Sequence, residues 1–112
     1  VPMHKDTLRK RGYNQAELLA KECARILGIE YADLLAKTKK NKTQHSIKAA
    51  ERAKNVIGVY SPIDKNLIKG KRILIIDDII TTGSTLGECA RILNKCKCGE
   101  ICCCTLCTSL LI

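Results

Sequence analysis

Two adjacent aspartates follow an apolar run in the sequence ILIIDDIITTGST, residues 73–85, and a glycine and several hydroxyl-bearing residues come after them. The run Ile73–Ile76 is typical of a strand buried on both faces, so we expect Asp77 and Asp78 where that strand ends. Repulsion and desolvation disfavour two neighbouring carboxylates unless a polar or cationic group lies opposite them. The pair is therefore a candidate binding site.

The turn after the aspartates has the composition of an anion-binding loop. Its residues are Thr81, Thr82, Gly83, Ser84 and Thr85. They lead into a helix predicted to begin near Thr85, and a helix start offers unpaired backbone N–H groups and the positive end of a dipole to a phosphate. The glycine lets the backbone approach closely, and the hydroxyls add donors. A second interpretation, compatible with the first, is that Thr85 and Glu88 form a capping box.

Other phosphate-binding motifs fit this stretch less well. A P-loop needs a lysine after its last glycine, and a dinucleotide fingerprint needs three spaced glycines; neither is present. Carboxylates accept hydrogen bonds from hydroxyls, and they stand here a few residues before the phosphate donors. That order suits a ligand with both vicinal hydroxyls and a phosphate, such as ribose 5-phosphate.

The elements that must position this site alternate between helix and strand. Helices are predicted from Asn14, which with Glu17 resembles a reciprocal cap, to Gly28, and from Thr85 to Gly99. Strands and shorter segments are predicted at 34–37 (strand), 38–46 (loop), 47–54 (short helix), 56–60 (strand), 72–77 (strand) and 101–107 (buried strand). This order favours an α/β fold with a mostly parallel, twisted sheet flanked by helices. Ligands of such sheets bind outside the carboxyl ends of the strands, where residues 77–85 are expected.

Length and charge limit the functions to be considered. With 112 residues, we expect the whole chain, 1–112, to form a single domain. The 20 Lys and Arg against 11 Asp and Glu give a net charge of +9, which favours nucleic acid, phosphorylated small molecules or pyrophosphate as partners, although a solvated basic surface is an alternative. Without Phe or Trp, and with three Tyr, base-stacking platforms are largely missing. No run approaches the roughly 18 apolar residues of a membrane span and no signal peptide is recognisable, so we expect a cytoplasmic location.

Eight cysteines are present, and seven of them lie between Cys89 and Cys107. A reducing cytoplasm disfavours disulfides. The CxC and CxxC pairs formed by Cys96, Cys98, Cys104 and Cys107 raise the alternative of a zinc site. Strand alternation, however, places Cys104 and Cys107 on opposite faces, and cysteine also fills buried strands as a small hydrophobe. We therefore expect these cysteines to be structural.

The acidic and hydroxyl-rich stretch resembles the phosphoribosyl-pyrophosphate (PRPP) signature of type I phosphoribosyltransferases. Three further segments narrow the resemblance to the ComF family of competence-associated, phosphoribosyltransferase-like proteins: RGYNQAELLAK at 11–21, TQ at 43–44 and ERAKNVIGVY at 51–60, together with GKRILIIDDIITTGSTLGECARIL at 70–93. The resemblance covers most of the chain and implies a type I phosphoribosyltransferase-like core.

The resemblance also implies roles for individual residues. Asp77 and Asp78 would hold the ribose hydroxyls, directly or through water bound to Mg²⁺, and Thr81 to Thr85 would hold the 5-phosphate. A pyrophosphate loop is expected in the segment Lys5 to Gly12, with the candidates Lys5, Arg9, Arg11 and Gly12. A mobile loop that closes over the substrate and brings cations to the departing pyrophosphate is expected around the candidates Lys39, Lys40 and Lys42, beside Thr43 and Gln44.

Departures from the family pattern set further expectations. The first residues, VPMHKD, read as the end of a strand, so we expect that an upstream strand, a hood over the nucleobase and the family's cysteine-rich zinc module are missing. The final segment is cysteine-rich where the family has small apolar residues. Thr81 occupies the position at which 6-oxopurine transferases carry an aspartate, and this puts purine salvage in doubt.

Two functional classes follow from these observations. One is an enzyme that transfers the phosphoribosyl group of PRPP to an unknown acceptor, with Mg²⁺ and release of pyrophosphate. The other is a non-catalytic module that binds PRPP or nucleic acid and acts in DNA uptake through single-stranded DNA or competence-machinery proteins. A homodimer is compatible with either class.

Overall fold

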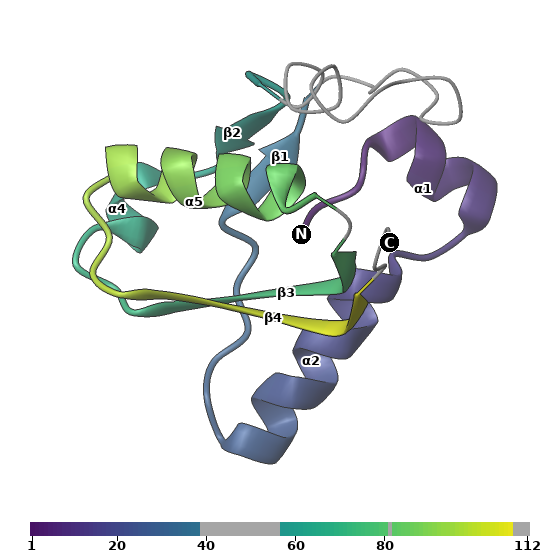
Figure 1. The fold of residues 1–112 in the computed structure, drawn as a ribbon, viewed down its shortest axis with the longest axis horizontal. Coiled ribbons are helices and arrows are strands. Elements are labelled where there is room, and N and C mark those ends of the chain that lie inside the picture. Colours follow the sequence, from purple (N-terminus) through teal and green to yellow (C-terminus); the bar gives the residue numbers. More distant parts are fainter. Residues whose placement is uncertain (39–56, 81, 109–112) are drawn as a thin grey trace.

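The computed structural model describes residues 1–38, 57–80 and 82–108. Their elements, in chain order, are α1 (Lys5–Arg11), α2 (Gln15–Leu27), β1 (Leu35–Lys37), β2 (Tyr60–Pro62), α4 (Lys65–Ile68), β3 (Ile73–Ile80), α5 (Ser84–Lys95) and β4 (Ile101–Thr108) (Figure 1). This mixture of helices and strands confirms the α/β class. The helix predicted at 47–54 and most of the loop predicted at 38–46 lie outside the described residues.

The described strands form two separate two-stranded sheets rather than one mostly parallel sheet. β3 and β4 are parallel, in register from Ile73 opposite Ile101 to Ile80 opposite Thr108, with α5 as the crossover. β1 and β2 are antiparallel, and Lys37 is opposite Tyr60. In Figure 1, α5 lies on one side of the β3–β4 pair and α2 on the other, and both helices contact β3.

The core lies where α5 meets β3 and the β1–β2 pair. The largest fully buried side chains are Ile68, Cys89 and Leu93, with relative exposures of 1 % or less. They belong to one hydrophobic cluster of buried residues: Val59, Tyr60, Ile68, Ile75, Leu86, Cys89, Ile92, Leu93 and Cys96. The apolar stripe predicted on the second long helix, at helical spacing from Leu86 to Cys96, is therefore confirmed as the face that packs on the sheet.

The first long helix, α2, has the ends that its sequence predicts. The Asn14 side chain accepts hydrogen bonds from the backbone N–H groups of Ala16 and Glu17, and Gly28 ends the helix in the left-handed conformation, with φ of 68°. Its predicted apolar stripe is only partly covered, since Ile26 and Leu27 are 67 % and 59 % exposed. Glu17 makes an ion pair with Lys21, one turn later in the helix.

The predicted capping box of Thr85 and Glu88 is wrong. α5 begins at Ser84, and Gly83 is its N-cap, without a side-chain capping hydrogen bond. The Glu88 carboxylate is buried, and it accepts hydrogen bonds from the Gly58 backbone N–H and the Arg91 guanidinium instead. A charge-assisted bond to a guanidinium one turn away is stronger than a bond to a backbone N–H alone, which explains this choice.

Four other predicted boundaries or environments also differ. β3 continues to Ile80, so the two aspartates lie inside the strand rather than after it. β2 begins at Tyr60, because Ile57 and Gly58 form a turn. α5 stops at Lys95, before Gly99. The final strand, expected to be buried, has mostly exposed side chains, including Cys102, Cys103, Cys104 and Cys107, because α2 and α5 make their main contacts with β3.

Among the described residues, no helix is both long enough and apolar enough to cross a membrane.

Truncating the central core residue should strongly destabilise the fold. Leu93→Ala removes a side chain that is 1 % exposed, and we expect a loss of about 2–5 kcal/mol of unfolding free energy from lost burial and the cavity left behind. Leu106→Ala is the matched control, because Leu106 is 74 % exposed and its truncation should change stability by no more than about 0.5 kcal/mol. Urea titrations monitored by circular dichroism measure both. Equal midpoints for the two variants would contradict this assignment of the core.

Candidate functional site

The two aspartates of β3 are half-buried and face different surroundings. Each Oδ1 atom accepts the backbone N–H of the next residue, with N···O distances of 3.0 Å for Asp77 and 2.9 Å for Asp78. Because successive side chains of a strand point to opposite faces, Asp77 lies on the face of Ile75, which packs in the core cluster with α5, and Asp78 lies on the other face. The structure therefore separates the roles of the two carboxylates, which the sequence presents as a pair.

Asp77 shares a small cavity with the start of α5. Its volume is about 30 Å³, room for a water molecule or two, and it is lined by Asp77, Ile79, Ile80, Gly83, Ser84, Thr85 and Leu86. Of the predicted PRPP-binding residues, the structure thus brings together Asp77, Gly83, Ser84 and Thr85. Asp78 and Thr82 do not line this cavity, and Thr81 lies outside the described residues.

The turn is shaped by its glycine and by two hydroxyls. Gly83 has φ of 81°, a conformation that side-chain-bearing residues rarely adopt, and its carbonyl accepts the Gly87 N–H at 2.8 Å. The Thr82 Oγ1 accepts the Ser84 N–H at 3.3 Å and lies 2.8 Å from the Ser84 hydroxyl. No side chain caps the helix, so its positive end is directed at the cavity that Asp77 lines.

Burial governs the electrostatics of Asp77. Desolvation raises its pKa to about 6, and the neighbouring Asp78 side chain adds to this rise. The Asp78 backbone N–H and the positive amino terminus act in the opposite direction. The terminus is close because the Val1 nitrogen donates a hydrogen bond to the Ile76 carbonyl at 2.8 Å. A cation placed against this carboxylate would compensate it.

The predicted pyrophosphate segment is a helix rather than a loop. Residues Lys5–Arg11 form α1, which ends at Gly12 with φ of 85°. Its last turn is basic, with Arg9, Lys10 and Arg11 exposed to solvent. In the described part of the chain, these side chains form no ion pair within 4.0 Å of Asp77 or Asp78. Their role at the pyrophosphate stays a prediction, as does that of Lys39, Lys40 and Lys42, which lie outside the described residues.

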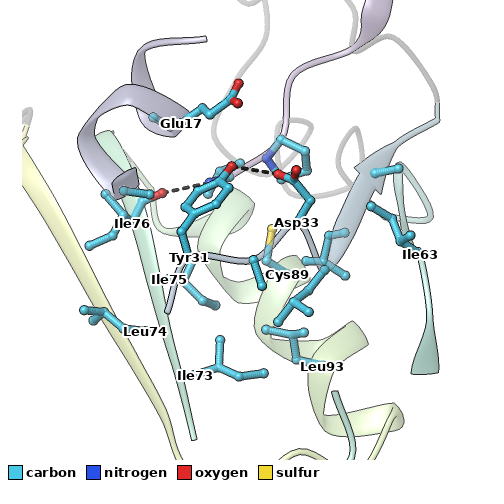
Figure 2. A pocket seen from close by; sticks show the side chains of 18 of the residues that line it. Glu17, Tyr31, Asp33, Ile63, Ile73, Leu74, Ile75, Ile76, Cys89 and Leu93 are labelled. Carbon is cyan, nitrogen blue, oxygen red and sulfur yellow. Dashed lines mark hydrogen bonds between the residues drawn. The ribbon is translucent and has the colours of Figure 1, made fainter. Parts of the chain in front are cut away.

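A second, much larger hollow lies along the other edge of β3. Its volume is about 1320 Å³, and Figure 2 shows Ile73 to Ile76 on one side, the α5 residues Cys89 and Leu93 behind them, and the segment with Tyr31 and Asp33 across the opening. The Tyr31 hydroxyl donates to the Asp33 carboxylate at 2.7 Å. Its lining is mostly apolar and includes neither Asp77 nor residues 82–85, so the larger hollow is not where the phosphate-binding chemistry lies.

A lysine that sequence reasoning missed lies near Asp77. Lys37 ends β1, and its ammonium lies 6.0 Å from the centroid of the Tyr60 ring, opposite it on β2. Burial lowers the pKa of Lys37, and the negative charges of Asp77 and of the Cys89 thiolate oppose that effect. No local pattern could have found this lysine, because its neighbours come from β2 and β3, over 20 positions away in sequence.

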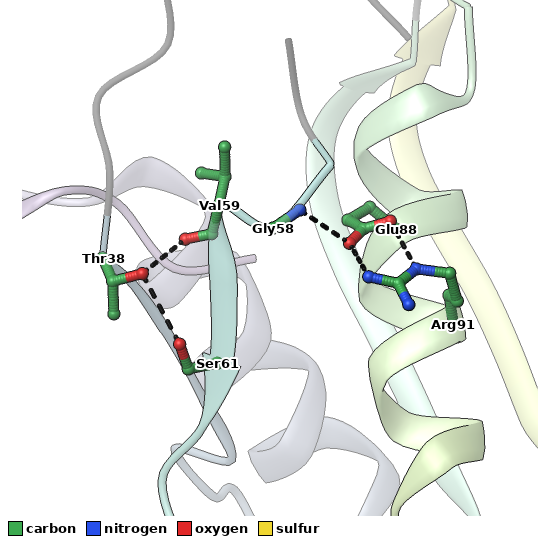
Figure 3. A network of polar contacts seen from close by, with 6 residues as sticks. All are labelled: Thr38, Gly58, Val59, Ser61, Glu88 and Arg91. Atoms are coloured by element: carbon green, nitrogen blue, oxygen red, sulfur yellow. Dashed lines mark hydrogen bonds and ion pairs between the residues drawn. The ribbon is translucent and has the colours of Figure 1, made fainter. Parts of the chain in front are cut away.

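Glu88 is the second residue that sequence reasoning placed wrongly. It is 5 % exposed, accepts a hydrogen bond from Arg91 Nε at 2.8 Å and one from the Gly58 N–H at 3.2 Å, and its pKa is lowered chiefly by the Arg91 bond (Figure 3). On the other side of the same turn, Thr38 donates to the Val59 carbonyl through both its backbone N–H and its hydroxyl. These bonds tie the residues on either side of segment 39–56 to each other and to α5.

The arrangement can hold oxygen-rich ligands, and the described residues offer no alternative metal centre. Among them, no group of three or more His, Cys, Asp or Glu side chains converges as metal ligands would. Cys98 and Cys107 donate to a side-chain amide or backbone carbonyl oxygen at 3.6 Å.

Comparison with known proteins identifies the family. The model of the phosphoribosyl transferase domain matches residues 14–110, a range that includes β3, the turn and α5. The chain belongs to the phosphoribosyltransferase family. No solved structure matches it.

Three relatives of this phosphoribosyltransferase-family chain confirm the ComF resemblance. Competence protein F of Haemophilus influenzae is 36 % identical over 103 residues, 90 % of this chain and 45 % of the relative. DNA utilization protein YhgH of Escherichia coli K12 is 30 % identical over 96 residues, 85 % and 41 %. Competence protein ComFC of Streptococcus pneumoniae is 33 % identical over 95 residues, 85 % and 40 %. The chain thus spans less than half the length of these relatives.

The raised pKa of Asp77 predicts a specific dependence of stability on pH. The folded-state pKa of about 6 exceeds the ordinary value of 3.8, so the folded state binds more protons than the unfolded state between these two values. Wild-type stability should therefore fall as pH rises from about 4 to about 6. Asp77→Asn removes this penalty and should be more stable than wild type at pH 7 by about 1 kcal/mol, after allowance for partial solvent exposure.

The measurement is urea unfolding of both proteins at several pH values in buffer containing a chelator. We expect the stability difference between Asp77→Asn and wild type to shrink as the pH approaches 4, where the wild-type carboxyl is protonated in both states. A difference that stays constant over this range would show that burial of the ionised group is not its cause.

Proposed function

We propose that this chain binds PRPP together with Mg²⁺ and transfers the phosphoribosyl group to an acceptor, with release of pyrophosphate. The observation that carries the proposal is the shared cavity of Asp77 and the start of α5. A carboxylate for the ribose hydroxyls and an uncapped helix start for the 5-phosphate lie side by side there, inside the region that matches the phosphoribosyltransferase domain.

The two carboxylates fit a magnesium ion by their chemistry. Mg²⁺ prefers oxygen ligands and keeps several of its waters, so one or two carboxylates suffice to hold it. Only the Oδ1 atoms of Asp77 and Asp78 accept backbone hydrogen bonds, which leaves the carboxylates able to bind through Oδ2. When bound, Mg²⁺ would neutralise charge on the pyrophosphate. It would also compensate the desolvated carboxylate of Asp77.

Each part of the site has a role in positioning. Asp77 would accept hydrogen bonds from the ribose hydroxyls, and the backbone of Gly83 to Thr85 would hold the 5-phosphate, so that the sugar is fixed at both ends. Asp78, on the other strand face, would act on Mg²⁺ or its waters. The basic residues of α1 and the lysines of segment 39–56 are proposed to approach the pyrophosphate side.

A second candidate function is a module that binds PRPP or nucleic acid in DNA uptake without catalysis. Two observations favour it: relatives are named for competence and DNA utilization, and the last turn of α1 presents Arg9, Lys10 and Arg11 to solvent in a chain of net charge +9. Binding of single-stranded DNA without PRPP, weakening steeply with salt, would support this function over transfer. Competence-machinery proteins are the other partners that it would require.

Removing both acidic charges should weaken PRPP binding. We expect the Asp77→Asn, Asp78→Asn double variant to lose at least about tenfold in Mg²⁺-dependent affinity, since one charge-assisted hydrogen bond is worth roughly 1.5–3 kcal/mol. Glu22→Gln is the charge-matched control, because Glu22 is exposed on α2 and pairs with Arg25. Isothermal titration calorimetry with and without Mg²⁺ makes the comparison. Unchanged affinity of the double variant would remove the ribose-site proposal.

Purine acceptors should react poorly even where PRPP binds. Thr81 takes the place of a carboxylate base, and positioned proton transfer typically contributes about 10²–10⁴ in rate. A coupled pyrophosphate assay across purines, pyrimidines and single-stranded DNA is the test, and we expect little pyrophosphate from hypoxanthine or guanine. Turnover of either base at about 1 s⁻¹ or faster would contradict the assignment.

A further inference from the structure

Lys37 is held in a fixed place by the strand pair to which it belongs. It is opposite Tyr60 in the antiparallel register of β1 and β2, and its ammonium lies 6.0 Å from the centre of that ring. Tyr60 is only 4 % exposed and is part of the core cluster packed against α5. The lysine is therefore positioned by a buried aromatic platform, unlike a lysine on a solvated loop.

The ammonium of Lys37 lacks an ion-pair partner. It is half-buried, yet in the described part of the chain no carboxylate lies within 4.0 Å of it. The charged and titratable groups that affect it are Asp77 on β3 and Cys89 on α5. Burial raises the pKa of the Cys89 thiol to about 12, so this thiol is neutral at pH 7 and Asp77 is the anionic neighbour. A desolvated cation without a direct partner favours the binding of an anion.

Asp77 connects Lys37 to the phosphate-binding turn. One side of Asp77 lines the cavity with Gly83 and Thr85, and its charge also reaches Lys37 on β1. A ligand whose hydroxyls are held at Asp77 would therefore meet a helix start in one direction and an ammonium in another. PRPP has this distribution of charge, since its ribose carries a phosphate at one end and a diphosphate at the other.

We propose that Lys37 and the ring beneath it form a subsite for the diphosphate of PRPP, separate from the turn that holds the 5-phosphate. The proposal rests on the proposed function, because it assigns the second anionic group of the same ligand. It differs from a purely structural role, in which the aliphatic stem of Lys37 covers Tyr60 and the ammonium is merely solvated.

The test compares three ligands that divide the site. Isothermal titration calorimetry is carried out with Mg²⁺ and inorganic pyrophosphate, ribose 5-phosphate or PRPP, using the wild-type chain, Lys37→Met and Lys37→Arg. Methionine keeps the apolar stem on Tyr60 and removes the charge, whereas arginine keeps the charge. Lys69→Met is the matched control, since Lys69 is exposed at the end of α4. Urea midpoints confirm that all variants fold.

We expect Lys37→Met to weaken pyrophosphate and PRPP binding at least about tenfold, as loss of a charge-assisted contact does, and to change ribose 5-phosphate binding less than about twofold. Lys37→Arg should retain most of the affinity, and Lys69→Met all of it. Equal weakening of all three ligands, no weakening of any, or no binding of pyrophosphate to wild type would each overturn the subsite. If wild type binds pyrophosphate but neither ribose 5-phosphate nor PRPP, the proposed function fails, and the pyrophosphate titration of Lys37→Met still decides the role of this lysine.

Discussion

The packing of α5 against β3 is the constraint on which the rest of the structure depends. Cys89 and Leu93 are almost completely buried against the face of β3 that carries Ile75, and Asp77 is the next residue on that same face. The turn between the two elements is short, so the helix start has to lie beside Asp77. Hydrophobic burial in the middle of the molecule therefore fixes the distance between a carboxylate and a phosphate seat at its edge, without any direct bond between them.

The same helix also organises the β1–β2 pair. Glu88, on the flank of α5, holds the Gly58 N–H just before β2, and Tyr60 packs into the core two residues later. Because Lys37 is opposite Tyr60, its location follows from that packing. One helix thus coordinates three chain segments that are distant in sequence, and the family's signature stretch, which ends at Thr85, lies at its start.

The sequence predicts most of what is local. The ends of α2 follow from Asn14 and Gly28, whose side-chain amide and left-handed backbone are short-range devices, and the buried face of α5 follows from helical periodicity. It fails where a distant partner decides. Glu88 has the spacing of a capping residue but finds Gly58 and Arg91, and the cysteines of β4 read as core residues although no helix in the described chain covers them well. Lys37 carries no sequence signal, since its importance lies in cross-strand pairing.

The hollow beside β3 has a consequence for how this chain behaves among other polypeptides. In the described residues, β3 pairs with β4 on one edge only, and on the other edge the Ile76 carbonyl is met by the Val1 nitrogen, at the border of an apolar space. An open edge with apolar residues around it is a template for strand addition, which native sheets usually cover or charge. The positive charge at Val1 and the chain's net charge of +9 oppose such pairing between identical copies, so the state of association should be sensitive to ionic strength.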